Sequence, residues 1–371
     1  MWVYFLLSAV MLVYSCTVSV PENLPEKLID GIALLSVPDV AHQRVTELIE
    51  SFMLKYSSGS SDRYNQKSGS MNDLIFFRDF SDLTKTPDDI LKTSQKLYNG
   101  FIADGYVYDG DVVDVTYINQ QVTDSYGVVK VRNVTENTEI DVEKILAADF
   151  FLPFEDLSQP LVLIYHTHST ESYIPSDDNR FSSAYPTRSD DENANMIRVG
   201  EEICAVLESR GINTVHDRTV YDEVYTGAYE KSRAGVERML TRYPSIIITL
   251  DIHRDAIYYD DSTRVRPVTE INGKKAAQMM IIAGAEGGNV TAFPTWEKNL
   301  NFALRLCQTV NSSYDNLMKP VYFCNRKYNM DMTPYSLLIE VGTDVNTLEQ
   351  ATLSARLLGD SLAKLIKESK K

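Results

Sequence analysis

Apolar residues fall into two alternating patterns from residue 160 to the C-terminus. Short continuous runs rich in Val, Ile and Leu, such as Leu161–Tyr165, Ile246–Ile252 and Leu337–Ile339, are typical of strands buried on both faces of a sheet. The stretches between them repeat apolar residues every three or four positions, which is the spacing of one helix face. This alternation predicts an α/β fold with a mixed, largely parallel sheet flanked by helices. Further elements predicted here are strands at 212–215 and 276–283 and helices at 195–210, 229–243, 299–310 and 346–368, the last opened by a capping box, Asn346-Thr-Leu-Glu349.

Residues before position 159 do not show this alternation of strand and helix patterns. Met1–Val20 carry no charge and nearly reach the about 20 residues that span a bilayer, so a signal-anchor or transmembrane helix is expected. Residues 21–158 are expected to form an N-terminal α+β region with a flexible Ser- and Gly-rich linker at 57–70. The expected units are therefore an anchor at 1–20, this region at 21–158 and an α/β domain at 159–371.

The composition argues against some classes of protein. With 52 acidic and 36 basic residues, the 371-residue chain has a net charge of −16. This charge repels the phosphates of nucleic acids, so no nucleic-acid partner is expected. None of the four cysteines stands in a Cys-x-x-Cys pair, which argues against a thiolate zinc site and favours free buried thiols.

Three of the predicted strands deliver a histidine or a glutamate at their C-terminal ends. The first strand is followed by His166, His168 and Glu171, the second by His253, and the third ends in Glu340. In open α/β sheets, the carboxyl ends of the strands form the edge at which ligands bind. These side chains are therefore expected to meet in one site.

Imidazole and carboxylate groups at such an edge suit a catalytic zinc ion, which takes three protein ligands and one water. The metal lowers the pKa of that water to about 7, and a carboxylate that does not bind the metal takes its proton. His168, His253 and Glu340 cover three of these four roles.

Two glutamates compete for the fourth role. Glu171 follows His168 in a His-x-x-Glu spacing that resembles zinc carboxypeptidases. Glu192 ends the acidic run 190–192 just before a predicted helix, where the helix N-terminus favours a carboxylate. The residues alone leave this choice open, and His166 is left as a supporting group or a substrate contact.

Several motifs between about residue 159 and the C-terminus resemble those of one family. They are His166-Thr-His168-x-x-Glu171-x-Tyr173, Asp251-Ile-His253-Arg254-Asp255-Ala256, Trp296-x-x-Asn299-Leu-x-Phe-Ala303, Arg326-x-Tyr328-Asn329 and Leu338-Ile-Glu340-Val-Gly342-x-x-x-Asn346-Thr347. In order and spacing, this set resembles the stage II sporulation protein P family. That family is in turn similar to zinc N-acetylmuramoyl-L-alanine amidases.

The resemblance implies a set of metal ligands. His168, Glu192 and His253 would bind the zinc ion. Where the amidases have Gly-His-Gly-Gly, this chain has Thr-His-Ser-Thr. This departure leaves Glu171 and His166 as alternative ligands.

The resemblance also implies the reaction. Glu340 would be the general base, joined in the catalytic set by Arg254 and His166. The enzyme would be a membrane-anchored, Zn²⁺-dependent hydrolase that cleaves the amide between N-acetylmuramic acid and L-alanine of the peptidoglycan stem peptide. A second, endopeptidase activity on peptide cross-links is implied as well. The protein would degrade the septal wall during sporulation engulfment, outside the cytoplasm, with stage II sporulation proteins D and M as partners.

Two other functions fit parts of the pattern. A zinc carboxypeptidase-like peptidase would use Glu171 as a metal ligand and Arg254 to clamp a terminal carboxylate. A non-catalytic, wall-binding scaffold on a hydrolase fold would not need both histidines and Glu340. The presence of all three argues for an enzyme.

Overall fold

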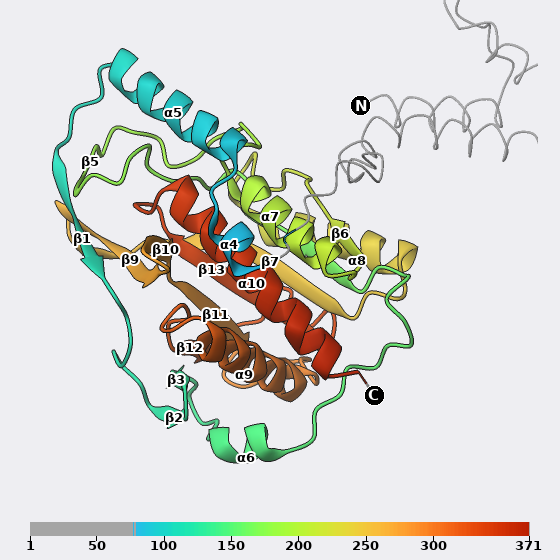
Figure 1. The fold of residues 1–371 in the computed structure, drawn as a ribbon. Coiled ribbons are helices and arrows are strands. Elements are labelled where there is room, and N and C mark those ends of the chain that lie inside the picture. The colour runs from blue at the N-terminus through green and yellow to red at the C-terminus, as the bar shows by residue number, and fades with distance from the viewer. Residues whose placement is uncertain (1–76, 78, 371) are drawn as a thin grey trace, which may run out of the picture. The chain divides into compact units, whose positions relative to one another are not determined.

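Eight strands form the central sheet of the computed structural model, which describes residue 77 and residues 79–370 (Figure 1). Neighbouring strands run parallel except at β2–β3 and β11–β13. The predicted α/β fold with a mixed, largely parallel sheet is thereby confirmed. In spatial order the strands are β2 (Asp124–Tyr126), β3 (Val129–Asn133), β12 (Val321–Cys324), β11 (Met279–Gly284), β13 (Tyr335–Thr343), β7 (Ile248–Asp255), β4 (Val162–Tyr165) and β6 (Thr214–His216).

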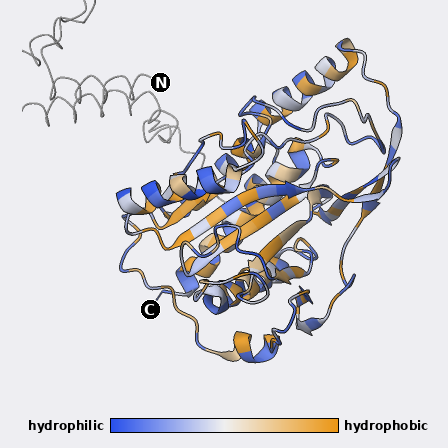
Figure 2. Ribbon diagram, turned by 180° about the vertical axis from the view of Figure 1, so that it is seen from behind, coloured by the Kyte–Doolittle hydropathy of each residue, from blue (hydrophilic) through white to orange (hydrophobic). Residues whose placement is uncertain are grey.

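The central strands are hydrophobic (Figure 2) because helices cover both of their faces. Alternate residues of a strand point to opposite faces. Val162 and Ile164 of β4 belong to the core cluster that contains α7 residues, whereas Leu163 belongs to a cluster with Val236 of α8. The helices are α7 (Met196–Ser209), α9 (Trp296–Ser313) and α10 (Leu348–Glu368), which pack side by side, and α8 (Ala228–Arg242) on the other face of β4.

A second sheet joins distant parts of the sequence. Its strand β1 (Gly110–Val115) runs parallel to β9 (Thr263–Ile271), and in the first sheet β3 pairs with β12. In each sheet a strand from before residue 159 therefore pairs with a strand from after it. The buried Arg266 of β9 donates from Nε to Asp114 Oδ1 of β1 at 2.5 Å. The strands are β10 (Lys274–Ala277), β9 (Thr263–Ile271), β1 (Gly110–Val115) and β5 (Arg180–Phe181), with β8 (Tyr258–Asp260) also on β9; the remaining helices are α4 (Phe80–Thr84), α5 (Asp88–Ala103) and α6 (Val142–Ala147).

Two predicted elements differ in the structure. The strand expected at 276–283 is interrupted at Gln278, and its halves, β10 and β11, belong to different sheets. The buried Gln278 side chain bonds both the N–H and the carbonyl of Tyr117, at 2.6 and 3.0 Å, and thereby fixes the break. Helix α10 is capped one residue later than expected, because Thr347 and Gln350 form the capping box.

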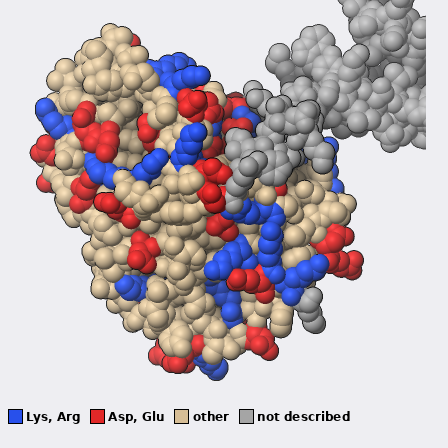
Figure 3. All heavy atoms as spheres, in the orientation of Figure 1, with Lys and Arg blue, Asp and Glu red and all other residues tan. Residues whose placement is uncertain are grey.

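Basic and acidic side chains lie interspersed on the face seen in Figure 3. Lys275 Nζ, for example, lies 2.9 Å from an oxygen of Asp114 and 3.0 Å from one of Asp177. Local pairs of this kind reduce the repulsion between neighbouring acidic side chains.

Several expectations concern the N-terminal segment and the thiols. Within the described part of the chain, the structure has no helix with the length and apolar character needed to cross a membrane. The expected anchor at 1–20 and the linker at 57–70 lie outside the described residues. Cys204, Cys307 and Cys324 are free and buried, as expected.

Candidate active site

Strands β4, β7 and β13 are neighbours whose C-terminal ends point the same way. Glu340 of β13 is in register with His253 of β7, and Tyr165, the last residue of β4, is in register with Asp251. The residues that follow Tyr165 therefore emerge beside His253. The structure brings the three strand ends together at one edge of the sheet.

His253 lies between two carboxylates. Its Nε2 forms an ion pair with Asp251 Oδ1 at 2.8 Å, without the angle of a hydrogen bond, and its Nδ1 is 3.8 Å from Glu171 Oε2. The His168 ring stands perpendicular to the His253 ring, with 5.4 Å between the centroids. Although burial alone lowers it, the Asp251 carboxylate raises the pKa of His253 to about 9. His168, Glu171 and His253 therefore form one cluster.

Two arginines hold Glu171 in this position. Arg188 Nη2 is 3.4 Å from Glu171 Oε1, and the backbone N–H of Arg254 donates to Glu171 Oε2 at 3.3 Å. The Arg254 guanidinium donates to the carbonyls of Ser172 and Thr187. Arg254 thus braces the loop that carries Glu171, and the catalytic role expected for its side chain stays a prediction.

Asp222 anchors the segment around His168. Its Oδ2 accepts hydrogen bonds from Thr170 Oγ1 at 2.6 Å and from Arg188 Nη1 at 2.7 Å, and lies 3.8 Å from His168 Nδ1. Tyr225 stacks on the His168 ring with 4.6 Å between centroids. Sequence patterns do not reveal Asp222 and Tyr225 as site residues, because Asp222 is 52 residues from Thr170 and no local pattern links them.

Glu340 has one oxygen without a partner. Its Oε2 is buried and receives no hydrogen bond from any described residue. Burial raises the pKa of Glu340 to about 8, opposed by the charge of His253 and reinforced by that of Asp255. A carboxyl group with a raised pKa and a free oxygen exchanges protons near neutral pH, which a general base requires.

Glu192 is paired elsewhere. It is partly exposed, and its Oε2 accepts a hydrogen bond from Arg218 Nη2 at 2.6 Å. Among the described residues, no contact joins Glu192 to His168 or His253. Its role as a metal ligand stays a prediction, while Glu171 is the glutamate that lies beside His253.

His166 faces the interior, beside a second histidine. Its Nε2 is 2.9 Å from His216 Nε2, and its Nδ1 is 3.0 Å from the carbonyl oxygen of Ile252. A Cβ on Gly200 of α7 would lie 2.6 Å from Nε2 of each ring, so only glycine fits there. Burial lowers the pKa of His166 to about 4 and that of His216 well below its usual value. Both histidines are therefore neutral at pH 7, and both ring nitrogens of His166 are engaged within the fold.

This buried pair predicts a loss of stability in acid. A histidine with a depressed folded-state pKa takes up a proton on unfolding, so its contribution is complete above the unfolded pKa of about 6.5 and is lost as the pH falls toward the folded value. For His166, with a folded pKa of about 4, the loss is roughly 1.4 kcal/mol per pH unit in that window. In urea unfolding between about pH 7.5 and 5, His216→Gln should show a shallower pH slope than the unsubstituted protein. Equal slopes would show that the pair does not control acid stability.

The side chains of His168, His253 and Glu171 are of the types that bind zinc. His168 Nδ1 is buried without a hydrogen-bond partner, and Asp251 holds Nε2 of His253 and leaves Nδ1 available, as carboxylates do for metal-binding imidazoles. The 3.8 Å between His253 Nδ1 and Glu171 Oε2 is close to the about 3.4 Å between two ligands of tetrahedral zinc at about 2.1 Å each. No three His, Cys, Asp or Glu side chains in the described ranges form a complete metal cluster. Zinc binding would therefore require small shifts of these side chains.

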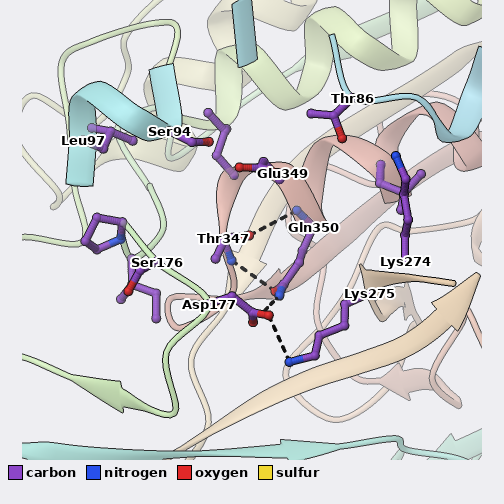
Figure 4. A pocket seen from close by; sticks show the side chains of 14 residues that line it. Thr86, Ser94, Leu97, Ser176, Asp177, Lys274, Lys275, Thr347, Glu349 and Gln350 are labelled. Atoms are coloured by element: carbon purple, nitrogen blue, oxygen red, sulfur yellow. Dashed lines mark hydrogen bonds and ion pairs between the residues drawn. The ribbon is translucent and has the colours of Figure 1, made fainter. Parts of the chain in front are cut away.

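A cavity of about 350 Å³ lies at the start of α10 (Figure 4). Its lining contains none of the histidines or glutamates of the cluster described above. Gln350 and Lys275 both reach Asp177 across it. The cavity is therefore separate from the cluster of His168, Glu171 and His253.

The family of the chain follows from a direct comparison. Residues 116–363 match the family described as stage II sporulation protein P. The chain belongs to that family. The resemblance inferred from the motifs is thereby confirmed. A curated relative, stage II sporulation protein P of Bacillus subtilis (strain 168), is 29% identical over 223 residues, which cover 57% of this chain and 52% of the relative. This member of the stage II sporulation protein P family thus spans about half the length of the curated relative it matches.

Solved structures with similarity to this stage II sporulation protein P family member are amidases by description. N-acetylmuramoyl-L-alanine amidase AmiC2 of Nostoc punctiforme is 14% identical, with a TM-score of 0.35, over 57% of this chain and 98% of that chain. The N-acetylmuramoyl-L-alanine amidase from Clostridium difficile 630 is 16% identical, with a TM-score of 0.32, over 57% and 94%. The CwlD amidase from Clostridioides difficile, in complex with the GerS lipoprotein, is 10% identical, with a TM-score of 0.34, over 56% and 99%. With these low TM-scores, the family assignment rests on the sequence match.

Proposed function

We propose that this protein is a zinc-dependent peptidoglycan hydrolase that cleaves the amide between N-acetylmuramic acid and L-alanine. One observation carries the proposal: His168, Glu171 and His253 lie together at the edge where Glu340 presents an unpartnered oxygen. Membership of the stage II sporulation protein P family supports wall digestion during sporulation. The motif resemblance to zinc amidases supports the choice of bond.

His168, Glu171 and His253 would hold the zinc ion. When bound, zinc would supply a positive charge that lowers the pKa of a water molecule to about 7. Asp251 would orient His253 by holding Nε2, and Arg188 would orient Glu171.

Glu340 would move the proton. It would accept the proton of the attacking water and return it to the nitrogen of the departing L-alanine amine. The burial of Glu340 favours proton uptake, and its Oε2 has no partner that competes for the proton. Its register opposite His253 supports a position next to the reacting carbonyl.

The partners of the two glutamates support Glu171 over Glu192 as the metal ligand. Glu171 Oε2 is 3.8 Å from His253 Nδ1, whereas Glu192 forms an ion pair with Arg218 at 2.6 Å. Binding zinc through Glu192 would require breaking that ion pair.

The position of Arg254 bears on the peptidase alternative. A carboxypeptidase needs a cation that is free to clamp a terminal carboxylate. The Arg254 guanidinium instead donates to two backbone carbonyls, at 3.2 and 3.0 Å. This observation supports an amidase over a carboxypeptidase.

Membrane attachment and partners extend the proposal. An anchor at Met1–Val20 would keep the enzyme at the sporulation septum, outside the cytoplasm. Stage II sporulation proteins D and M would act with it, as the resemblance implies. Cleavage of peptide cross-links is included as a second activity.

The bond and the metal can be tested together. Full-length protein purified with zinc is expected to release stem peptides with a free L-alanine amino group from isolated peptidoglycan. Mass spectrometry of the fragments identifies the bond. Chelation should stop the release, and added zinc should restore it. Fragments from cut glycan strands, or activity that survives chelation, would contradict the proposal.

A further inference from the structure

Tyr229, near the start of α8, lies against two histidines of the active-site cluster. Its ring stands perpendicular to the His168 ring, with 5.7 Å between centroids. It also stacks on the His253 ring, with 6.4 Å between centroids and 10° between the planes. Contact with both rings places the Tyr229 side chain in the active site.

The loop between β12 and β13 holds Tyr229 from behind. Asn329 Nδ2 donates to the Tyr229 carbonyl at 3.0 Å, and the Tyr328 ring stacks on the Tyr229 ring with 5.2 Å between centroids. Both loop residues have left-handed backbone, with φ of 42° at Tyr328 and 58° at Asn329. Such strain persists only where the surrounding structure fixes the backbone. This motif, which the proposed chemistry does not use, therefore fixes the position of Tyr229.

The hydroxyl of Tyr229 is left without a partner. It forms no hydrogen bond with any described residue, and the side chain is only partly buried. By contrast, Tyr173 donates to the carbonyl of Val341 at 3.0 Å, and Tyr221 donates to Asp217 at 2.5 Å. A tyrosine hydroxyl has an ordinary pKa of about 10, and burial raises the pKa of Tyr229 further. The hydroxyl is therefore a hydrogen-bond donor at neutral pH.

Other donors beside the cluster are already engaged. Arg188 donates to Asp222 at 2.7 Å, and the Arg254 guanidinium donates to two backbone carbonyls. An ionised carboxylate such as that of Glu340 only accepts hydrogen bonds. Attack on an amide places negative charge on the carbonyl oxygen, and a donor fixed in advance at that point stabilises the transition state. The Tyr229 hydroxyl is a donor still available for this purpose.

We propose that the Tyr229 hydroxyl is a catalytic group that donates a hydrogen bond to the oxygen of the scissile amide as it becomes negatively charged. This inference rests on the proposed function, because it concerns the same reaction. When the water oxygen bonds to the carbonyl carbon, the C=O electron pair moves onto the carbonyl oxygen, and Glu340 takes the proton of the water. Tyr229 stabilises that oxygen and keeps its own proton. When the electron pair returns, the C–N bond breaks and Glu340 gives the proton to the nitrogen.

Tyr229→Phe tests the hydroxyl, because phenylalanine keeps the ring and its stacking. The variant is expected to lower kcat roughly 10²- to 10³-fold, the usual cost of removing one such donor. KM for an N-acetylmuramoyl-peptide and the zinc content should stay the same, since the hydrogen bond is made only in the transition state.

A second measurement does not depend on turnover. Calorimetry gives the affinity of full-length protein for a phosphinate analogue, in which a tetrahedral, negatively charged group replaces the scissile amide. Because such an analogue resembles the transition state, Tyr229→Phe should weaken its binding by a factor similar to the loss in kcat. Tyr328→Phe is the matched control. It removes the same hydroxyl from the ring stacked on Tyr229 and should behave like the unsubstituted protein.

The contrary outcomes separate the two proposals. If Tyr229→Phe keeps full activity, loses zinc, or loses no more activity than Tyr328→Phe, the hydroxyl is not the donor and the proposed hydrolase stands. If the unsubstituted protein with zinc does not cleave the amide, the proposed hydrolase is wrong. The phosphinate titration then decides the role of the hydroxyl alone: weaker binding by Tyr229→Phe supports it, and equal affinities overturn it.

Discussion

Replacing Glu340 by Gln is expected to lower the turnover of peptidoglycan by about 10²–10⁴-fold while zinc remains bound. Glutamine keeps the shape of the side chain but cannot accept the proton of the attacking water. The buried Oε2 atom of Glu340 receives no hydrogen bond within the described part of the chain, and burial raises its pKa to about 8. The loss should therefore appear in kcat, as expected of a group that acts in the chemical step and not in substrate binding.

Two measurements on the same preparation check this result. The rate of stem-peptide release gives the loss of turnover, and elemental analysis gives the zinc content. Glu349→Gln is a suitable control, because Glu349 lines the cavity at the start of α10 and not the cluster of histidines. If Glu340→Gln loses its zinc, Glu340 is a metal ligand. If it keeps full activity, another group is the base.

Glu171→Gln is expected to release zinc, and Glu192→Gln is expected to retain it. Changing a residue that only orients a ligand typically costs 10- to 100-fold in metal affinity, so loss of the ligand itself should cost more than about 100-fold. Glu171 lies 3.8 Å from His253 Nδ1 and is held by Arg188. The substitution removes the negatively charged carboxylate of Glu171 from the cluster.

Glu192→Gln is the matched control for this experiment. It removes the same charge but breaks only the partly exposed ion pair with Arg218, which is worth about 0–1 kcal/mol. Zinc affinity measured by competition with a chromogenic chelator compares the two variants directly. The opposite pattern, in which Glu192→Gln loses zinc and Glu171→Gln keeps it, would restore the ligand set that the family resemblance implies.

The sequence alone predicted the central sheet because its strands carry a local signal. β4, β7 and β13 are almost wholly buried, and Val, Ile, Leu and Tyr residues make up all of β4 and recur through β7 and β13. Strand β9 carries no such signal, since its sequence mixes Arg264, Arg266 and Pro267 with apolar residues. Its pairing with β1, from far upstream, forms the strand. Arg266 is fully buried there because Asp114 of β1 neutralises it.

The break at Gln278 also depends on residues that are distant in sequence. Residues 276–283 are apolar except for Gln278, and a single polar residue does not by itself indicate an interruption of the predicted strand. The break depends on hydrogen bonds from Gln278 to Tyr117 and Asn316, which are distant in sequence. These bonds direct the two halves of the run into different sheets.

For the active site, the sequence is sufficient to predict that the strand ends carrying His168, His253 and Glu340 meet, because parallel strands in one sheet end at a common edge. It did not determine which glutamate joins them. Glu171 and Glu192 both lie in polar segments, and their partners depend on tertiary contacts: Glu192 pairs with Arg218, whereas Glu171 lies beside His253. The partner of His166 was decided in the same way: His216 is 50 residues away, and the parallel pairing of β4 with β6 brings the two rings into contact.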